Sequence, residues 1–383
     1  MRRITLLFAA LALASLASVG ALLALPMAPA RGDVTLPPGF TQSQVVSGFT
    51  DPMDMEFAPD GRLFVAEQAG KLRVLRSNGN LATFLDISPK VDSAFERGLM
   101  GVAFDPNYST NRFIYLYYTS KATSTTPVHN RIVRVTAKSS GSGVVAGSER
   151  LLLRLNNQST NYHLGGGIDF GNDGKLYATT GDNGTPSKVQ QLSNLFGKMV
   201  RINKDGTIPS DNPFYSTATG TNRALWALGL RNPFKFAVSR TSGAIFINDV
   251  GQDTWEEINR GASRANYGWP LYEGPTSVSN YTPPILAYEH SGADPVTIGC
   301  AITGGTFYEP ATVRFPGSYL GDYFFADLCN GWIRSYDTTN KTASGFATGL
   351  SSVVDLEVSN DGALYLLSRG TPGSVDKITS SGN

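Results

Sequence analysis

A short motif that recurs about six times along the chain constrains the fold more than any other feature of the sequence. Each copy has an apolar residue, a turn that often contains Asp-Gly, a strand-like segment, a link and a second strand-like segment. Apolar and polar residues alternate in these segments, which is typical of half-buried β-strands. The copies span residues 57–76, 104–135, 170–203, 238–259, 307–337 and 358–378.

A sheet motif repeated in this way predicts an all-β fold, a six-bladed β-propeller. One blade cannot bury both of its faces, so neighbouring blades must stack into a ring. Residues 31–383 are therefore expected to form one domain, with its function where the blade loops meet at the mouth of a central channel. A pair of β-sandwiches is the alternative, but sandwiches rarely repeat Asp-Gly turns in register. Residues 189–196 are the best candidate for a short helix.

Residues 1–30 have the features of a secretory signal peptide. Arg2 and Arg3 precede an apolar run at 6–25, and Ala-Pro-Ala at 28–30 forms a cleavage site. An uncleaved anchor is the alternative, because the run is nearly long enough to span a bilayer. The small residues favour cleavage, so we expect a secreted or periplasmic protein with no membrane association after cleavage.

Charge and cysteine content narrow the class of protein further. The formal net charge is +1 and 16% of residues are charged, which excludes a strongly basic nucleic-acid binder and a polybasic membrane binder. Cys300 and Cys329 are the two cysteines, and an even count in an exported protein favours a disulfide. Such a bond would close a loop of about 30 residues and contribute roughly 3 kcal/mol. Two buried free thiols are the alternative.

His163 is one of three histidines and precedes Gly165, Gly166 and Gly167. These glycines leave little side-chain cover, so a ligand could approach closely. Asp182 follows at the end of the next hairpin, so a histidine and a carboxylate are expected near one edge of the sheet. A neutral imidazole there could take a proton from a hydroxyl group. A purely structural histidine is the alternative.

Two further segments carry groups suited to catalysis or binding. Arg231 and Asn232 precede a proline and offer a cation and an amide that could polarise a carbonyl or quinone oxygen. The alternative is that Arg231 forms an ion pair with a carboxylate of one blade. Residues 249–259 are rich in oxygen ligands that suit calcium, although a turn capped by acidic residues is equally compatible. Trp269 and Tyr267 could stack on a sugar or a flat cofactor, or pack between blades.

Dinucleotide-binding, P-loop, serine-hydrolase and zinc-protease motifs are absent.

Five segments together resemble the soluble glucose/sorbosone dehydrogenases. They are ERGLMGVAFDP at 96–106, His163 with its glycines, Gly-Asp at 181–182, LRNP at 230–233 and NYGWP at 266–270. That family consists of six-bladed propellers that use pyrroloquinoline quinone (PQQ) with calcium, and the resemblance covers nearly all of the chain after residue 35. The two cysteines and residues 321–327 look closer to a branch that includes the hedgehog-interacting-protein-like propellers.

The resemblance implies a role for each matching residue. His163 matches the general base, and Arg231 with Asn232 matches the positions that polarise the quinone. Glu96, Asp182 and, more weakly, Thr303 match contacts to the cofactor. The carbonyls of Gly251 and Gln252 match ligands of the cofactor's calcium. Glu257 and Tyr267 match ligands of structural calcium.

The chain also departs from the family pattern. Glu96 replaces a glutamine, and Tyr162 replaces an acidic residue before the base. Cys329, Ser352 and Val354 replace a lysine and two arginines that bind the cofactor's carboxylates in the family. Each lost charge-assisted hydrogen bond is worth about 1.5–3 kcal/mol, so the departures predict quinone binding that is weaker, differently arranged or absent.

Three functional hypotheses follow from these residues. The first is an exported quinoprotein that oxidises an aldose at C1 to the lactone, with hydride transfer to PQQ, and passes electrons to an external acceptor. The second is a non-catalytic propeller that binds a carbohydrate or a protein. The third is a calcium-dependent lactone hydrolase that needs no quinone.

Overall fold

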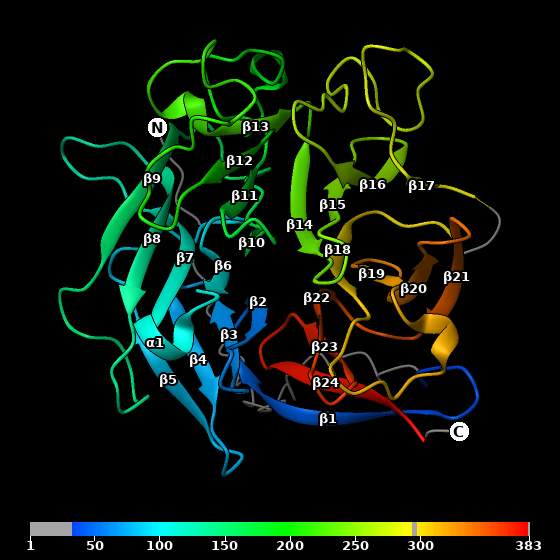
Figure 1. Ribbon diagram of the computed structural model, residues 1–383. Coiled ribbons are helices and arrows are strands. Elements are labelled where there is room, and N and C mark those ends of the chain that lie inside the picture. The colour runs from blue at the N-terminus through cyan, green and yellow to red at the C-terminus, as the bar shows by residue number, and fades with distance from the viewer. Residues whose placement is uncertain (1–32, 293–296, 382–383) are drawn as a thin grey trace, which may run out of the picture. The chain divides into compact units, whose positions relative to one another are not determined.

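The computed structural model describes residues 33–292 and 297–381, and the proposed signal peptide lies outside these residues. Six antiparallel four-stranded sheets form the blades of a propeller, which confirms the predicted fold class (Figure 1). Helix is scarce. It amounts to α1 (Tyr108–Asn111) and three short 3-10 turns, η1 (Pro186–Lys188), η2 (Gly220–Ala224) and η3 (Gly317–Tyr319), among the described residues.

Each blade adds its strands outward from the centre of the ring in sequence order, except the last blade. The innermost strands are β2 (Pro52–Phe57), β6 (Leu99–Phe104), β10 (Ile168–Phe170), β14 (Asn232–Val238), β18 (Ile302–Phe307) and β22 (Val353–Val358). The second strands are β3 (Leu63–Glu67), β7 (Phe113–Ser120), β11 (Leu176–Thr180), β15 (Ile245–Val250), β19 (Tyr323–Asp327) and β23 (Leu364–Ser368). The third strands are β4 (Lys71–Leu75), β8 (His129–Thr136), β12 (Lys198–Ile202), β16 (Trp255–Gly261), β20 (Trp332–Asp337) and β24 (Gly373–Ser380).

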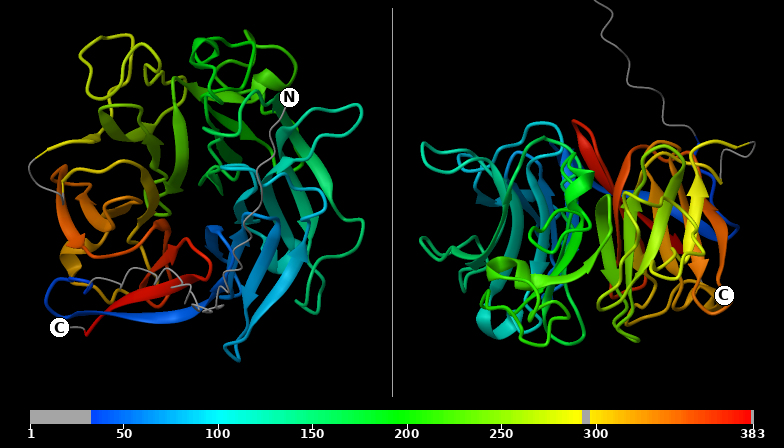
Figure 2. Two further views of the ribbon diagram at one scale, coloured as in Figure 1. Left: turned by 180° about the vertical axis from the view of Figure 1, so that it is seen from behind. Right: turned by 90° about the horizontal axis from the view of Figure 1, so that it is seen from above.

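The outermost strands are β5 (Leu81–Asp86), β9 (Arg150–Asn157), β13 (Leu225–Leu228), β17 (Leu286–Glu289), β21 (Thr342–Ala347) and β1 (Phe40–Phe49). The sixth blade therefore takes its outer strand from the beginning of the described chain, because β1 pairs antiparallel with β24 (Figure 2). Neighbouring innermost strands contact one another all the way around, including β22 with β2. The ring is thus closed by hydrogen bonds between segments from opposite ends of the sequence.

Large apolar side chains hold neighbouring blades together. The rings of Phe64 and Phe104, from the first two blades, have centroids 5.0 Å apart, and those of Tyr115 and Phe170, from the second and third, are also 5.0 Å apart. All four rings are buried. Full burial of a side chain of this size contributes about 1.5–3 kcal/mol, so the contacts between blades stabilise a ring that no blade could stabilise alone.

The short helix that we expected at residues 189–196 is not formed, and this prediction was wrong. These residues make turns after η1. The ammonium group of the buried Lys198 donates hydrogen bonds to the carbonyl oxygens of Val189 and Phe196. Lys198 thus binds the carbonyl oxygens at both ends of the segment for which the sequence pattern predicted a helix.

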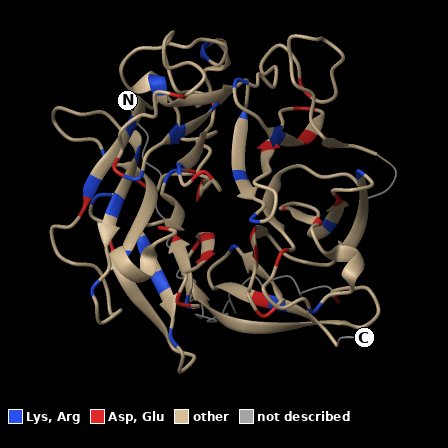
Figure 3. Ribbon diagram, in the orientation of Figure 1, with Lys and Arg blue, Asp and Glu red and all other residues tan. Residues whose placement is uncertain are grey.

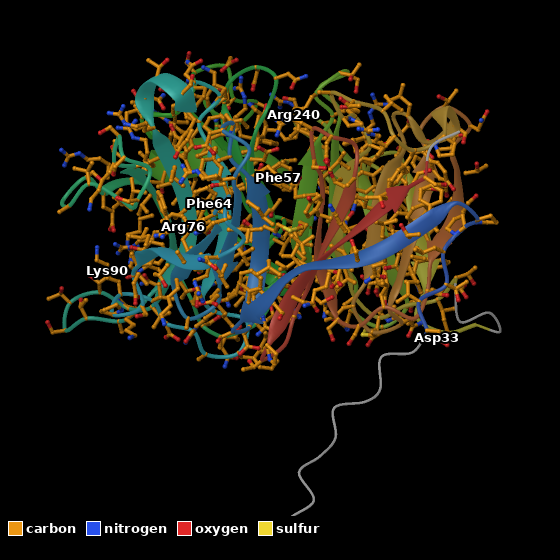
Figure 4. All side chains as sticks on the ribbon, turned by 90° about the horizontal axis from the view of Figure 1, so that it is seen from below. Asp33, Phe57, Phe64, Arg76, Lys90 and Arg240 are labelled. Carbon is orange, nitrogen blue, oxygen red and sulfur yellow. A yellow bond between two sulfur atoms is a disulfide. The ribbon has the colours of Figure 1, made fainter. Side chains whose placement is uncertain are left out.

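The six innermost strands all run in the same sense along the central channel. Their last residues line one cavity of about 610 Å³, which we call the strand-end mouth, and Figure 4 labels Phe57 and Arg240 from this lining. The opposite opening, where the innermost strands begin, is called the strand-start mouth. His163 and Arg231 lie just before β10 and β14 and therefore belong to the strand-start mouth. In the described part of the chain, no helix has the length and apolar character to cross a membrane.

Candidate active site at the strand-start mouth

His163 is held by two carboxylates and by its own backbone conformation. Its ring nitrogen Nδ1 lies 2.9 Å from Oδ1 of Asp182, and its backbone N–H donates to Oε2 of Glu96 at 2.8 Å. The histidine side chain is 19% exposed, whereas that of Asp182 is 2% exposed. With Nδ1 engaged by the aspartate, Nε2 is the ring nitrogen left to meet a ligand.

Asp182 is fixed on every side. Oδ2 accepts a hydrogen bond from the indole Nε1 of Trp269 at 2.9 Å, and Oδ1 also accepts one from the backbone N–H of Gly184 at 2.8 Å. Its own N–H donates to the carbonyl of Arg231. The carboxylate therefore orients the His163 ring and ties it to the next blade. It lies behind the histidine, which differs from the cofactor contact that the resemblance implied for Asp182.

The three glycines after His163 do not open a path for a ligand, contrary to our expectation. A Cβ atom on Gly165 would lie 2.6 Å from the carbonyl oxygen of Thr179, and one on Gly166 would lie 2.9 Å from Cβ of Met100. A Cβ atom on Gly167 would meet the ring of Phe236 at 2.8 Å. These glycines allow close packing of backbone against neighbouring strands, and no side chain fits there.

Arg231 lies at the edge of the fourth blade with a part of its donor capacity unused. Its NH1 donates to the carbonyl of Val250 at 3.0 Å, and the guanidinium lies 5.6 Å from the ring centroid of Trp269. Its Nε is buried and has no hydrogen-bond partner among the described residues. A half-buried cation with an unused donor suits an electron-rich oxygen of a ligand.

Asn232 and Asp249 anchor the segment that carries Arg231. The Asp249 carboxylate accepts hydrogen bonds from the backbone N–H groups of Arg231 and Asn232, the latter at 2.7 Å. Oδ1 of Asn232 accepts from the N–H of Gly165 at 3.1 Å, so this amide links the arginine segment to the histidine loop. Asn232 is 5% exposed, and its observed contacts are structural.

Glu96 lies in the loop before β6 and faces both site residues. Burial raises the pKa of its carboxyl, and the charges of His163 and Arg231 act in the opposite direction. Next to it, the carbonyl oxygens of Phe95 and Arg97 accept hydrogen bonds from the side-chain amide of Gln68. Glu96 therefore lies close enough to the histidine and arginine to belong to the same site.

The loop after β15 offers free carbonyl oxygens for a cation. Oε1 of Glu273 accepts four consecutive backbone N–H groups, from Gln252 at 2.6 Å to Trp255 at 3.3 Å. The carbonyls of Gly251 and Gln252 accept no hydrogen bond within the described ranges 33–292 and 297–381. Unpaired carbonyls beside the Val250 carbonyl that binds Arg231 fit a calcium ion, a hard cation that prefers oxygen ligands.

Glu257 and Tyr267 lie behind this loop, around the same small pocket as Arg231 and Trp269. Burial raises the pKa of Glu257 to about 7. Burial, and then the charge of Glu257, raise the pKa of Asp249 well above its ordinary value. The Tyr267 hydroxyl donates to the carbonyl of Arg260, so only its backbone carbonyl could ligate a metal. Two buried carboxyls in one small pocket suit a structural cation.

The remaining sequence candidates lie elsewhere or are fully engaged. The Thr303 hydroxyl is buried and donates to the carbonyl of Val353 at 2.6 Å, so it serves strand packing. Cys300 and Cys329 form a disulfide, as expected. Among the described residues, they and Asp327 are the one group of three Cys, His, Asp or Glu ligands close enough to share a metal, and the disulfide occupies both sulfurs. Val354 is buried.

Exposed apolar side chains and unusual backbone angles also gather at this mouth. Phe95 is 69% exposed and adjoins Glu96, Tyr162 is 37% exposed with its ring edge against His163, and Tyr272 is 39% exposed near Trp269. The non-glycine residues with a left-handed φ at this mouth are Asp51, Phe95, His163, Asn183 and Ser352. Such conformations concentrate at functional sites, and exposed aromatic rings suit the apolar face of a sugar.

The fold and the site define a six-bladed propeller with a carboxylate-held histidine and a half-buried arginine at one mouth. The family model described as glucose/sorbosone dehydrogenase matches residues 49–377. The chain belongs to that family, as the sequence motifs indicated.

Individual relatives differ in how fully they match. The chain is 29% identical over 344 residues to aldose sugar dehydrogenase YliI of Escherichia coli K12, covering 86% of this chain and 90% of that protein. It is 31% identical over 375 residues to the HIPL2 protein of Arabidopsis thaliana, covering 77% of this chain and 53% of that protein. The chain thus spans about half the length of the HIPL2 relative.

A solved structure confirms the fold independently. The PQQ-bound aldose sugar dehydrogenase of Streptomyces coelicolor superposes with a TM-score of 0.73 at 23% identity, covering 90% of this chain and 99% of that chain. At this identity the likeness is one of fold.

Sequence reasoning missed two polar residues of the strand-start mouth, Gln68 and Arg369. Each lies in the turn between the second and third strands of its blade, as Asp182 does. Aligning the six repeats at that turn would have placed both at the same mouth as Asp182 and His163. The signal was therefore present in the phase of the repeat.

Proposed function

We propose that this chain is an exported aldose dehydrogenase that oxidises the C1 hydroxyl of a sugar to the lactone and depends on PQQ and calcium. The observation that carries the proposal is the pair formed by His163 and the buried Asp182, next to an arginine with an unused donor. The family supports a dehydrogenase, and YliI is named an aldose sugar dehydrogenase. The exposed aromatic rings support a sugar substrate.

His163 would act as the general base. Its Nδ1–H donates to Asp182, which fixes the tautomer and leaves Nε2 with a lone pair. Nε2 then takes the proton of the C1 hydroxyl as the C1–H bond breaks. The buried carboxylate stabilises the imidazolium that forms, so the proton rests on the histidine until it leaves to solvent.

The residues around His163 fit the proposed cofactor. Nε of Arg231 lacks a partner among the described residues, and the Gly251 and Gln252 carbonyls accept no hydrogen bond there. Arg231 would bind a quinone oxygen, and the two carbonyls would hold calcium. PQQ, when bound with calcium, supplies an electrophile that accepts the C1 hydride, and its electrons then pass to an external acceptor.

Export fits the same proposal. The disulfide between Cys300 and Cys329 is a bond that persists in oxidising compartments, and the N-terminal sequence has signal-peptide features. A secreted or periplasmic location follows as part of the proposal.

The test is reconstitution of purified protein with PQQ and calcium, followed by an aldose assay with an artificial electron acceptor. His163→Ala is expected to lower kcat by about 10²–10⁴, the usual contribution of a general base. His290→Gln is the matched control, because His290 is also 19% exposed and pairs with a carboxylate, Glu256. No turnover by the wild type, or equal turnover by wild type and His163→Ala, would refute the proposal.

A non-catalytic binding propeller is the second candidate. Where the family pattern has basic residues, this chain has Cys329, which forms a disulfide, and Val354, which is buried. A HIPL protein is also among the relatives of this chain. This candidate predicts no saturable PQQ binding in calcium, measured by fluorescence or calorimetry. The lactone hydrolase alternative predicts lactone turnover without any quinone in the same preparation.

A further inference from the structure

The turn between β23 and β24 places an arginine, Arg369, at the strand-start mouth in the sixth blade. Its backbone N–H donates to the carbonyl of Ser352 at 2.9 Å. Ser352 occupies a position where the family pattern has an arginine. The sixth blade therefore keeps a guanidinium group at this mouth, but a different turn supplies it.

The Arg369 side chain is built into the wall of the mouth. NH2 donates to Oε1 of Gln68, and NH1 contacts Sδ of Met53. Gln68 is itself 6% exposed and fixed by the carbonyls that flank Glu96. A continuous set of contacts thus runs from Arg369 through Gln68 to Glu96 and on to His163.

The guanidinium of Arg369 retains capacity for an anion. NH2 of Arg369 lies 3.9 Å from Oδ1 of Asp51, and the Asp51 side chain is 47% exposed, so this ion pair is weak. The Arg369 side chain is 28% exposed, and two of its five N–H donors have the contacts described above. Arg97, another cation of this mouth, uses all three of its guanidinium nitrogens for contacts with Gln158, Asp92 and Thr160.

PQQ carries three carboxylates, and a planar guanidinium binds a carboxylate with two parallel hydrogen bonds. We propose that Arg369, positioned by Gln68, binds a carboxylate of PQQ and replaces the basic residues missing at Cys329, Ser352 and Val354. Arg231 would hold the quinone end of the same molecule. This inference rests on the proposed function.

The test is a PQQ titration of purified protein in calcium, followed by protein fluorescence, which needs no turnover. Arg369→Gln is expected to weaken binding about 10- to 100-fold, in keeping with one lost charge-assisted pair. Arg369→Lys should recover part of the affinity, because it restores the charge but not the fork. Arg76→Gln is the matched control, since Arg76 is an exposed arginine after β4 (Figure 4), and its Kd should stay within about twofold.

Two further measurements separate carboxylate binding from a structural role. Raising the salt concentration should weaken PQQ binding less in Arg369→Gln than in the wild type, because one ion pair is gone. The Tm of the unliganded variants should stay near that of the wild type. Unchanged PQQ affinity in Arg369→Gln, or equal losses in the Gln and Lys variants together with a lowered Tm, would overturn the inference. Absence of saturable binding in the wild type would instead remove the proposed function, and this inference with it.

Discussion

Three histidines in this chain show how surroundings decide what one side chain can do. His129 is fully buried, and both of its ring nitrogens have partners, the carbonyl of Pro127 and the guanidinium of Arg131. His290 pairs through Nε2 with Glu256, which raises the pKa of the histidine. His163 alone among the three combines a free Nε2 with Asp182 behind it. The chemistry that we propose at the strand-start mouth therefore depends on Asp182 as much as on His163.

The first prediction concerns that aspartate. Asp182→Asn keeps the size of the side chain but removes the charge that stabilises a protonated His163, and its amide can hold the wrong tautomer. We expect kcat to fall by about 100-fold or more, whereas the Kd for PQQ should change little because Asp182 lies behind the histidine. The kcat and the PQQ titration are measured on the same preparation. A variant with unchanged kcat would show that the aspartate does not orient the base.

At the scale of elements, the repeat carried most of the information in the sequence. Each predicted copy begins at the last residue of an innermost strand, so the phase of all six blades was correct. The strand β1, which closes the ring, was missed because it lies outside the repeats and pairs with β24 across the whole sequence. Local patterns specify strands and turns, whereas only ring closure specifies the partner of a terminal strand.

The candidate site was predicted unevenly for the same reason. The histidine and aspartate lie in one hairpin, and short-range spacing placed them together. Arg369 and Gln68 contact each other across 301 positions of sequence, and each alone resembles a solvated turn residue. The glycines after His163 were misread because the sequence does not show what their missing side chains would meet.

The disulfide provides a prediction at the element scale. Cys300 and Cys329 join the segment before β18 to the turn after β19, with a sequence separation of 29. The buried Asp327 also holds both segments, since its carboxylate accepts hydrogen bonds from the N–H groups of Cys300 and Cys329. The double variant Cys300→Ser/Cys329→Ser should therefore fold, but with a free energy of unfolding lowered by about 3 kcal/mol.

Denaturant unfolding with and without reductant checks this expectation. Reductant should destabilise the wild type by a similar amount and leave the double variant unaffected. An equal effect of reductant on both proteins would show that its action does not pass through this bond.

At the scale of the whole molecule, the two mouths of the channel differ in chemistry. A buried ion-pair group, Lys235 with Asp54 and Asp355, joins three blades within the channel. Beyond it, the strand-end mouth is lined by Glu56 and Glu357 and by further acidic residues. Figure 3 marks the positions of Asp and Glu along the ribbon in red, several of them near the centre of the ring. The strand-start mouth carries His163, Arg231 and Arg369. The strand-end cavity concentrates negative charge, because its lining has eight Asp or Glu residues and two cations, Lys235 and Arg240.

This concentration of charge determines how stability depends on pH. Burial, followed by nearby carboxylates, raises the pKa of Glu56 and of Glu357 well above the ordinary value of 4.5. Each group binds its proton more tightly in the folded state than in the unfolded state. Its contribution to stability is therefore fully present below pH 4.5 and is lost as the pH rises through the folded-state pKa.

The double variant Glu56→Gln/Glu357→Gln tests this prediction, because a glutamine stays neutral at every pH. Near pH 4.5 the variant and the wild type should have similar free energies of unfolding. At pH values between the unfolded-state and folded-state pKa, each glutamate is ionised in the unfolded protein but still protonated in the folded protein. The free energy of unfolding of the wild type should then fall by up to about 1.4 kcal/mol per pH unit for each of these groups, so the variant becomes the more stable protein. Denaturant unfolding at pH 5 and pH 8 measures the difference, and Glu289→Gln, at an exposed strand position, is the control. If the double variant gains no stability relative to the wild type between the two pH values, the two carboxyls do not bind their protons more tightly in the folded state, and the prediction is wrong.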